Sequence, residues 1–577
     1  MRPFLLALLW ASPIAFAQNQ TQPDADKKTI RLEGHVLSVT GESVRKATVR
    51  LQGNSAVQGG QLRPSAYTES TDTAGKFVFE DVAEGNYTLS AEKAGFVTQR
   101  YGARSTGSSG AVLNLVPGVA LRDLDIKMTP QGVISGKVTD LDGDPVNGGR
   151  VTVMRFAYPR GRKQLQQTAG ATIDDQGEFR VADLAPGRYY LSVTDNRAPA
   201  NGPDKEGQDS NVTTYYPNVI EPASAAPLDV TAGVELSGID IRMRRAKVYS
   251  IRGKAVDPVT GAAPANAVLT LRKSSTDDSP IVAALTNIRQ LRPDGGFEFP
   301  GLMPGTYVLQ TQNGSLSGSY AGRTEITITD SNIEGAVLAL GPAAEINGTV
   351  KLEGGDFHTL LKPPGSANSG APSPAASAVG PRFTLTFAEV DGIGIGSPGA
   401  QVKDDGTFKV TGLGLNKYAI NFRNLPQGAY VKTIQYGGQD VTHSLLDMST
   451  AANGTLEVTL SDKAADVNGS VHNDKGEALP GVQVTLWPKI FDPGNTSSIR
   501  QANTDQNGGF KFVSLRPGEY FVAAWEELDT GLAQSPDFLK NLTGDASAIK
   551  LEEGGHESVD AKVVSRDKIV DEIAKIP

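Results

Sequence analysis

The sequence contains no cysteine. This absence excludes disulfide bonds, thiolate metal sites, a cysteine nucleophile and a lipid-modified N-terminal cysteine. Each folded unit of the chain must therefore be held together by its own apolar core. The chain has 577 residues, of which 39% are hydrophobic, which is enough apolar residues to form several such cores.

Histidine is scarce as well, and this argues against a metal-dependent hydrolase. The chain has five histidines, and the two that lie nearest in sequence, His443 and His472, are 29 residues apart. A catalytic zinc site normally includes two closely spaced ligands and a carboxylate base. There is also no Gly-x-Ser-x-Gly elbow between a strand and a helix. We therefore expect no catalytic residues, no metal site and no cofactor.

Long runs of one residue type are missing too. No Lys/Arg run accompanies the net charge of -9, which argues against nucleic acid as a partner. No stretch reaches the ~18 apolar residues of a transmembrane helix. The N-terminus has the pattern of a signal peptide instead: Arg2, the apolar run 4–10, and Ala15-Phe16-Ala17 before Gln18. We expect residues 1–17 to be removed and the mature protein to be periplasmic or extracellular, in a bacterial envelope.

What the chain does contain is a repeat. A Gly-x-Phe motif, followed by a tyrosine 10 residues after its phenylalanine, occurs five times. The constant distance indicates that the five copies share one fold. The pairs are Phe77 and Tyr87, Phe179 and Tyr189, Phe297 and Tyr307, Phe408 and Tyr418, and Phe510 and Tyr520.

Each copy opens with an alternating apolar segment around a glycine, at Gly34, Gly136, Gly253, Gly348 and Gly469. The distance from this glycine to the tyrosine is 53, 53, 54, 70 and 51 residues. The fourth copy is longer because residues 362–381 form a Pro/Gly/Ser/Ala-rich insertion, which we expect to be a disordered loop.

Period-two alternation between these landmarks predicts strands with one buried face, and the 64 glycines and 34 prolines predict frequent turns. The fold class is therefore all-β: tandem seven-stranded β-sandwich modules, arranged like beads on a string. Modules 1 to 5 are expected at 18–129, 130–245, 246–342, 343–461 and 462–565, followed by a short helix or tail at 566–577.

Two recurring features invite a functional interpretation and have a structural alternative. The Asp-x-x-Gly pieces at Asp72, Asp174 and Asp505 resemble calcium loops, but one carboxylate per loop is too few, and a side-chain-stabilised turn explains them better. The repeated tyrosine is expected to bury its ring while its hydroxyl finds a backbone partner.

The run from Ile134-Ser-Gly-Lys-Val through Asp174-Asp-Gln-Gly-Glu-Phe to Leu184-Ala-Pro-Gly-Arg-Tyr resembles the carboxypeptidase regulatory-like domain. The resemblance implies a transthyretin-like sandwich, related to Cna-B modules and grouped with carbohydrate-binding-like folds. It is good for copies 1, 2, 3 and 5 and weaker for copy 4, where Leu415-Asn416-Lys417-Tyr418 replaces the Pro-Gly turn. Some Cna-B relatives carry a Lys–Asn isopeptide bond, but no Lys, Glu and Asn recur at matching places here.

Module 5 contains the two tryptophans that remain after signal removal, Trp487 and Trp525. Alternation places both rings on the face opposite the expected core. They are the candidate binding residues, as a stacking platform for a sugar; the alternative is that they pack under the C-terminal segment or against module 4.

Three functions stay open at this point. The first is a non-enzymatic binding protein whose modules contact polysaccharide or envelope proteins. The second is a purely structural spacer, stalk or scaffold subunit of an envelope complex. The third, an enzyme with paired carboxylates on loops, has least in its favour, since no such pair can be identified from sequence. Fold-level resemblance does not choose among them.

Overall fold

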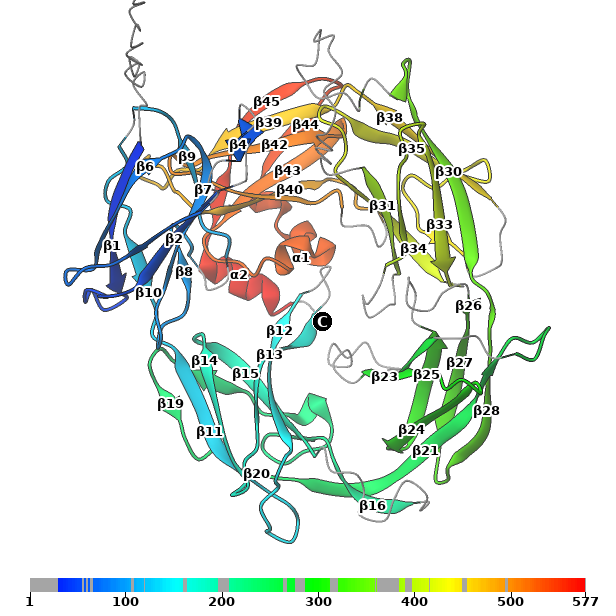
Figure 1. The fold of residues 1–577 in the computed structure, drawn as a ribbon. Coiled ribbons are helices and arrows are strands. Elements are labelled where there is room, and N and C mark those ends of the chain that lie inside the picture. The colour runs from blue at the N-terminus through cyan, green and yellow to red at the C-terminus, as the bar shows by residue number, and fades with distance from the viewer. Residues whose placement is uncertain are drawn as a thin grey trace, which may run out of the picture.

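A computed structural model describes residues 30–575. Excepted from this are 54–56, 59–60, 63–65, 105–107, 119, 159–162, 196–206, 263–266, 275–285, 312–319, 358–359, 361–382, 390–396, 415, 449–453 and 493–496. The expected signal peptide and the expected insertion at 362–381 lie outside the described residues. Nearly all regular structure is β, as predicted, and it forms paired sheets in each module (Figure 1).

Modules 1 and 2 each consist of two packed sheets. In module 1 the opening strand pairs with the Phe strand and, in parallel, with the closing strand, and the same three-part sheet occurs in module 2. The first sheets contain β1 (Ile30–Ser38), β6 (Lys76–Val82) and β10 (Ile126–Met128), and β11 (Gly132–Thr139), β14 (Glu178–Leu184), β19 (Glu235–Leu236) and β20 (Ile241–Arg242). The second sheets contain β2 (Thr48–Gly53), β5 (Ala66–Ser70), β7 (Gly85–Glu92), β8 (Gln99–Arg100) and β9 (Val112–Leu115), and β12 (Arg150–Ala157), β13 (Gln164–Thr172), β15 (Gly187–Thr194), β17 (Thr214–Tyr215) and β18 (Leu228–Val230). A small hairpin of β3 (Val57–Gln58) and β4 (Gln61–Leu62) and the 3-10 turn η2 (Pro222–Ser224) complete them.

Modules 3 and 4 repeat this plan. The first sheets contain β21 (Arg244–Val256), β24 (Gly296–Leu302) and β28 (Ile333–Ala339), joined by β16 (Gln208–Val212) of module 2, and β30 (Ala344–Leu352), β33 (Thr407–Leu413), β35 (Tyr430–Tyr436), β36 (Gln439–Asp440) and β38 (Thr455–Ser461). The second sheets contain β22 (Val268–Lys273), β23 (Thr286–Gln290), β25 (Gly305–Thr311) and β27 (Arg323–Ile328), and β31 (Thr384–Glu389), β32 (Gly399–Gln401), β34 (Lys417–Arg423) and β37 (Leu446–Asp447). β26 (Tyr320–Ala321) pairs with β29 (Gly341–Pro342).

Module 5 adds helices to the shared plan. Its first sheet contains β39 (Ala465–Ser470), β42 (Gly509–Leu515) and β45 (His556–Asp560), and its second contains β40 (Gln483–Pro488), β41 (Arg500–Asn503), β43 (Gly518–Trp525), β44 (Ser547–Leu551) and β46 (Lys562–Val564). The helical elements are η5 (Leu532–Gln534), α1 (Pro536–Asn541), η6 (Thr543–Asp545) and α2 (Arg566–Ile573), the last at the expected C-terminal helix. No helix among the described residues is long and apolar enough to cross a membrane.

The glycine of each opening strand is explained by the closing strand beside it. A Cβ at any of the five positions would lie 2.0–2.6 Å from a carbonyl oxygen of the closing strand or of the segment leading into it. Only glycine allows so close a backbone approach. This glycine therefore recurs in all five modules because the packing of the closing strand leaves no room for a Cβ.

A β-bulge recurs in the Phe strand of every module. Four residues after each phenylalanine the backbone has positive φ: Asp81, Asp183, Gly301, Gly412 and Ser514. The register between opening strand and Phe strand shifts at the same place in all five modules. The bulge brings the next apolar side chain back to the core, as for Leu184, which is 2% exposed.

Five apolar cores fill the sandwiches, one within each expected module, and each includes the Phe and Tyr of its repeat. Four of the tyrosine hydroxyls donate to the carbonyl oxygen four residues upstream: Tyr189 to Ala185 (2.7 Å), Tyr307 to Met303 (2.7 Å), Tyr418 to Gly414 (3.1 Å) and Tyr520 to Arg516 (2.8 Å). The predicted backbone partner is therefore present.

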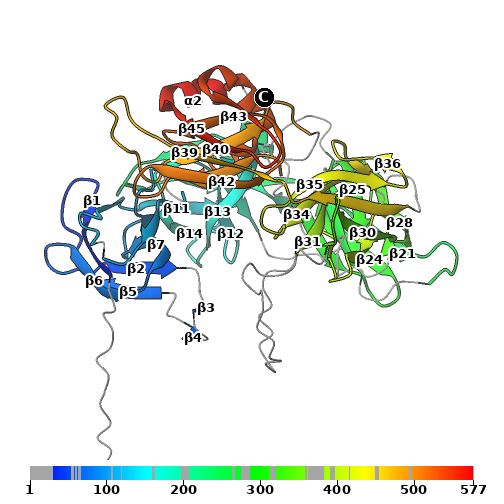
Figure 2. The ribbon, with the colours of Figure 1, turned by 90° about the horizontal axis from the view of Figure 1, so that it is seen from above.

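The modules follow one another around a ring, and module 5 returns to modules 1 and 2 (Figures 1 and 2). Modules 2 and 3 share a strand, since β21 runs through residues 245 and 246 and pairs with β16 before it enters module 3. The ring closes where Val112 of β9 bridges to Asp505 and where Asn503 Nδ2 donates to the Gly110 oxygen at 2.9 Å.

Candidate binding site

The two candidate tryptophans lie in a second apolar core of module 5. Trp487 on β40 and Trp525 on β43 stack at a centroid distance of 6.1 Å, and they are 0% and 1% exposed. As predicted from alternation, they lie outside the sandwich core. The structure nevertheless leaves neither ring a face toward solvent, so there is no exposed stacking platform at these two positions.

Three elements cover the tryptophans. Phe538 of α1 packs 5.8 Å from Trp525, α2 contributes Ile569, and Tyr158 of module 2 belongs to the same cluster. The alternative interpretation, in which the rings pack under the C-terminal segment, matches this arrangement. Sequence reasoning missed α1, although Ser535 as N-cap followed by Pro536 is a recognisable helix start.

The Asp-x-x-Gly pieces form turns. Asp174 Oδ1 accepts from the backbone nitrogens of Gln176 and Glu178 at 3.0 and 2.7 Å, and Asp72 and Asp505 make the same pair of bonds. Each of these carboxylates is thus used locally, which explains the motif without a metal. Within the described residues, no group of three or more His, Asp or Glu could hold a metal ion.

Asp505 has an additional role at the ring closure. Its Oδ2 accepts from Asn114 Nδ2 of module 1 at 3.1 Å, while Gln506 and the Asn114 backbone exchange two hydrogen bonds of 3.0 and 3.2 Å. The turn of module 5 therefore contacts the backbone of β9 in module 1, mainly through the Gln506 side chain.

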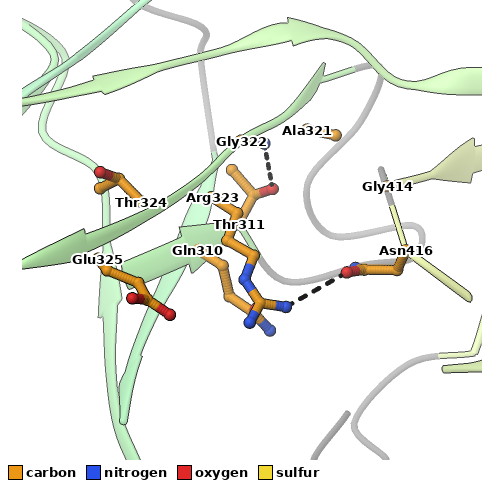
Figure 3. A pocket seen from close by; sticks show the side chains of 9 residues that line it. All are labelled: Gln310, Thr311, Ala321, Gly322, Arg323, Thr324, Glu325, Gly414 and Asn416. Carbon is orange, nitrogen blue, oxygen red and sulfur yellow. Dashed lines mark hydrogen bonds between the residues drawn. The ribbon is translucent and has the colours of Figure 1, made fainter. Parts of the chain in front are cut away.

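A pocket of about 330 Å³ lies where modules 3 and 4 meet (Figure 3). Sequence analysis did not find it, because its walls come from residues about 100 positions apart. Its lining consists of Gln310, Thr311, Ala321, Gly322, Arg323, Thr324, Glu325, Gly414 and Asn416.

Module 3 supplies the floor of this pocket. Gln310 on β25 and Arg323 on β27 are cross-strand partners, and their side chains lie on the same face of the sheet. Gln310 is 8% exposed, and its Oε1 has no hydrogen-bond partner. At the edge, the Thr311 hydroxyl accepts from the Gly322 backbone nitrogen at 3.1 Å.

Module 4 supplies the opposite wall through Asn416. Arg323 Nη1 donates to Asn416 Oδ1 at 3.4 Å, which is the side-chain contact that joins the two modules across the pocket (Figure 3). Asn416 stands two residues before Tyr418, where the other four modules have Gly85, Gly187, Gly305 and Gly518. The lost Pro-Gly turn of copy 4 was the sequence signal that could have pointed here.

Comparison with known proteins gives one family and several distant likenesses. Colossin-A of Dictyostelium discoideum is 21% identical over an alignment of 519 residues that covers 82% of this chain and 4% of that protein. The chain thus spans a small fraction of the length of this relative. Among solved structures, a streptococcal ancillary pilin is 12% identical, with 54% of this chain and 98% of that chain covered, at a TM-score of 0.19. The minor pilin GBS52 of Streptococcus agalactiae is 13% identical, with 38% and 97% covered, at a TM-score of 0.22.

The family model of the carboxypeptidase regulatory-like domain matches residues 31–128 and 133–214. These segments comprise module 1 and most of module 2, and they contain the first two Phe–Tyr repeats. Modules 3 to 5 repeat the same opening glycine, Phe strand bulge and Tyr strand. Residues 31–128 and 133–214 of this chain are therefore two carboxypeptidase regulatory-like domains.

Proposed function

We propose that this chain is an exported, non-enzymatic binding protein of the bacterial envelope, whose ring of modules binds polysaccharide or an envelope protein. The observation that carries the proposal is the closure of the ring between modules 5 and 1. A closed ring is shorter than an extended row of the same five modules, so it suits a spacer poorly. It also holds the surfaces of the five modules at fixed distances from one another. Fixed spacing favours simultaneous contacts with a repetitive or extended partner.

The test uses the mature chain, residues 18–577, in two parallel arms. One arm is a glycan array; the other is cross-linking to isolated envelope fractions, followed by identification of the linked protein. Saturable binding in either arm is the expected result. Absence of binding in both would overturn the proposal. Intact-mass measurement of the exported protein tests the expected signal-peptide cleavage, since cleavage before Gln18 removes residues 1–17.

A scaffold subunit is the second candidate, and one observation favours it. Modules 2 and 3 are joined by the continuous strand β21, and Arg245 on that strand pairs with Asp142 at 2.6 Å. A linker-free joint suits a part that transmits force or holds others in place. A scaffold would appear in the cross-linking arm as a stoichiometric partner, with no glycan bound.

A further inference from the structure

Asn416 is the first indication that the pocket between modules 3 and 4 is a built site. Four modules keep a glycine at this position, and copy 4 alone has a side chain there. That side chain lines the pocket and accepts from Arg323 of the neighbouring module. The departure from the repeat therefore coincides with the only use of this position for an inter-module contact among the described residues.

Gln310 is the second, independent indication. Its side chain lines the pocket and is only 8% exposed. Its Oε1 accepts no hydrogen bond. An unsatisfied buried acceptor destabilises the folded state. The corresponding positions, three residues after the tyrosine, are Ser90, Ser192, Asn421 and Ala523. The pocket wall of module 3 thus contains a long, largely buried amide side chain, and three of the other four modules have a shorter side chain without an amide at this position.

The lining defines the chemistry of that molecule. Arg323 and Glu325 contribute one positive and one negative charge, so the formal charge of the lining is zero. Amide, hydroxyl, guanidinium and carboxylate groups provide both donors and acceptors beside a larger apolar surface, and none of the lining side chains is aromatic. Hydroxyl groups, which donate and accept at once, complement such a mixed set. A volume of about 330 Å³ is at the small end of ligand sites, which run from ~300 Å³ upward.

The geometry points to a saccharide subsite at this joint: we propose that the pocket holds one neutral, hydroxyl-rich sugar unit, with its hydroxyls bonded to the Gln310 amide, Arg323 and Asn416. This inference rests on the proposed function and specifies its ligand class and location. Since the unit would contact both modules, its binding would also stiffen their joint.

The test compares the mature chain with single variants on an array of neutral, N-acetylated and uronic-acid saccharides, and then by calorimetric titration of the best monosaccharide and its polymer. Asn416→Gly restores the residue of the other modules, Arg323→Ala removes the central donor, and Gln310→Leu removes the amide. Each is expected to weaken binding of a neutral sugar at least tenfold. Arg289→Ala is the matched control, because Arg289 lies on β23 of the same sheet and does not line the pocket; its affinity should equal that of the unchanged chain.

The outcomes separate this inference from the proposed function. If the chain binds a saccharide and all three pocket variants bind it equally well, the subsite is overturned while the binding function stands. Binding of uronic acids alone would overturn the neutral ligand. If no saccharide binds, the subsite is wrong, and the cross-linking arm alone decides the proposed function. Gln310→Leu should leave the melting temperature equal or higher, since it removes an unsatisfied acceptor, so lost binding there cannot be attributed to unfolding.

Discussion

At the scale of single residues, the repeated glycines and tyrosines each meet a specific packing requirement of this fold. The opening glycine lets the backbone of the closing strand approach the opening strand. The tyrosine buries its ring in the core, and in four modules its hydroxyl donates a hydrogen bond to a backbone carbonyl. Both can be tested in module 5, because Trp487 and Trp525 lie there and tryptophan fluorescence of the mature chain reports on that module.

Gly469→Ala is expected to destabilise module 5 by about 2–3 kcal/mol, a typical cost of overpacking. The added Cβ would lie 2.4 Å from the Val559 oxygen and 2.2 Å from Phe510 Cζ. Urea unfolding followed by tryptophan fluorescence measures the change. Gly544→Ala is the control, since a Cβ there meets nothing within 4 Å; equal stability losses for both would contradict the packing argument.

Alkaline pH is expected to weaken module 5 through Tyr520. Burial raises the pKa of Tyr520 to about 12, as it does for Tyr215 and Tyr307. In the unfolded chain the phenol ionises near pH 10, so the unfolded state loses its proton first, and stability falls from pH 10 until about pH 12. The loss from this one group is about 2–3 kcal/mol. Tyr520→Phe should make the decline of module 5 shallower over this range; an unchanged slope would show that another group is responsible.

At the scale of elements, the C-terminal helices cover the aromatic face of module 5. They convert the outer face of the β40–β43 pair into a second core, which also includes Tyr158 of module 2. Ser535 caps α1 and Ser565 caps α2, each through its side-chain oxygen. The helices thereby protect the aromatic face and attach module 5 to its neighbour.

Phe538→Ala is expected to expose the tryptophans. Phe538 is fully buried, and large-to-small changes at such positions cost about 3–5 kcal/mol. Emission should shift to longer wavelength, and acrylamide quenching should increase, whereas in the unchanged chain both rings are shielded. Val570→Ala on α2 removes a 56% exposed side chain and should have no effect. Strong quenching of the unchanged chain would restore the idea of an exposed platform.

At the scale of the whole molecule, closure of the ring decides how the modules act together. The contact between modules 5 and 1 is tight: a Cβ on Gly481 would lie 2.0 Å from the Gly102 oxygen. Module 4 is joined to module 5 by polar contacts, including Tyr430 to Glu553 Oε1 at 2.8 Å. A ring held by such contacts presents its surfaces as one body.

Gly481→Ala combined with Tyr158→Ala is expected to open the ring. Small-angle scattering should then show a larger maximum dimension, with roughly 115–150 Å for five modules in line as the upper bound, since strands of seven to nine residues span roughly 23–30 Å at about 3.3 Å per residue. Gly476→Ala with Tyr158→Ala is the matched control, because Gly476 also has positive φ (78°) but has nothing within 4 Å. An extended shape of the unchanged chain would contradict closure.

Sequence alone determined the repeated sandwich and its landmarks, because strand alternation, turn residues and a close-approach glycine are local requirements; it left the C-terminal segment as either a short helix or a tail. It also placed Trp487 and Trp525 on the correct face. Only the tertiary structure decided what covers that face, since Phe538 and Tyr158 reach it from other parts of the chain. The same holds for the pocket of Gln310, Arg323 and Asn416 and for the ring itself. Periodicity within a strand carries no information about which module that strand will meet.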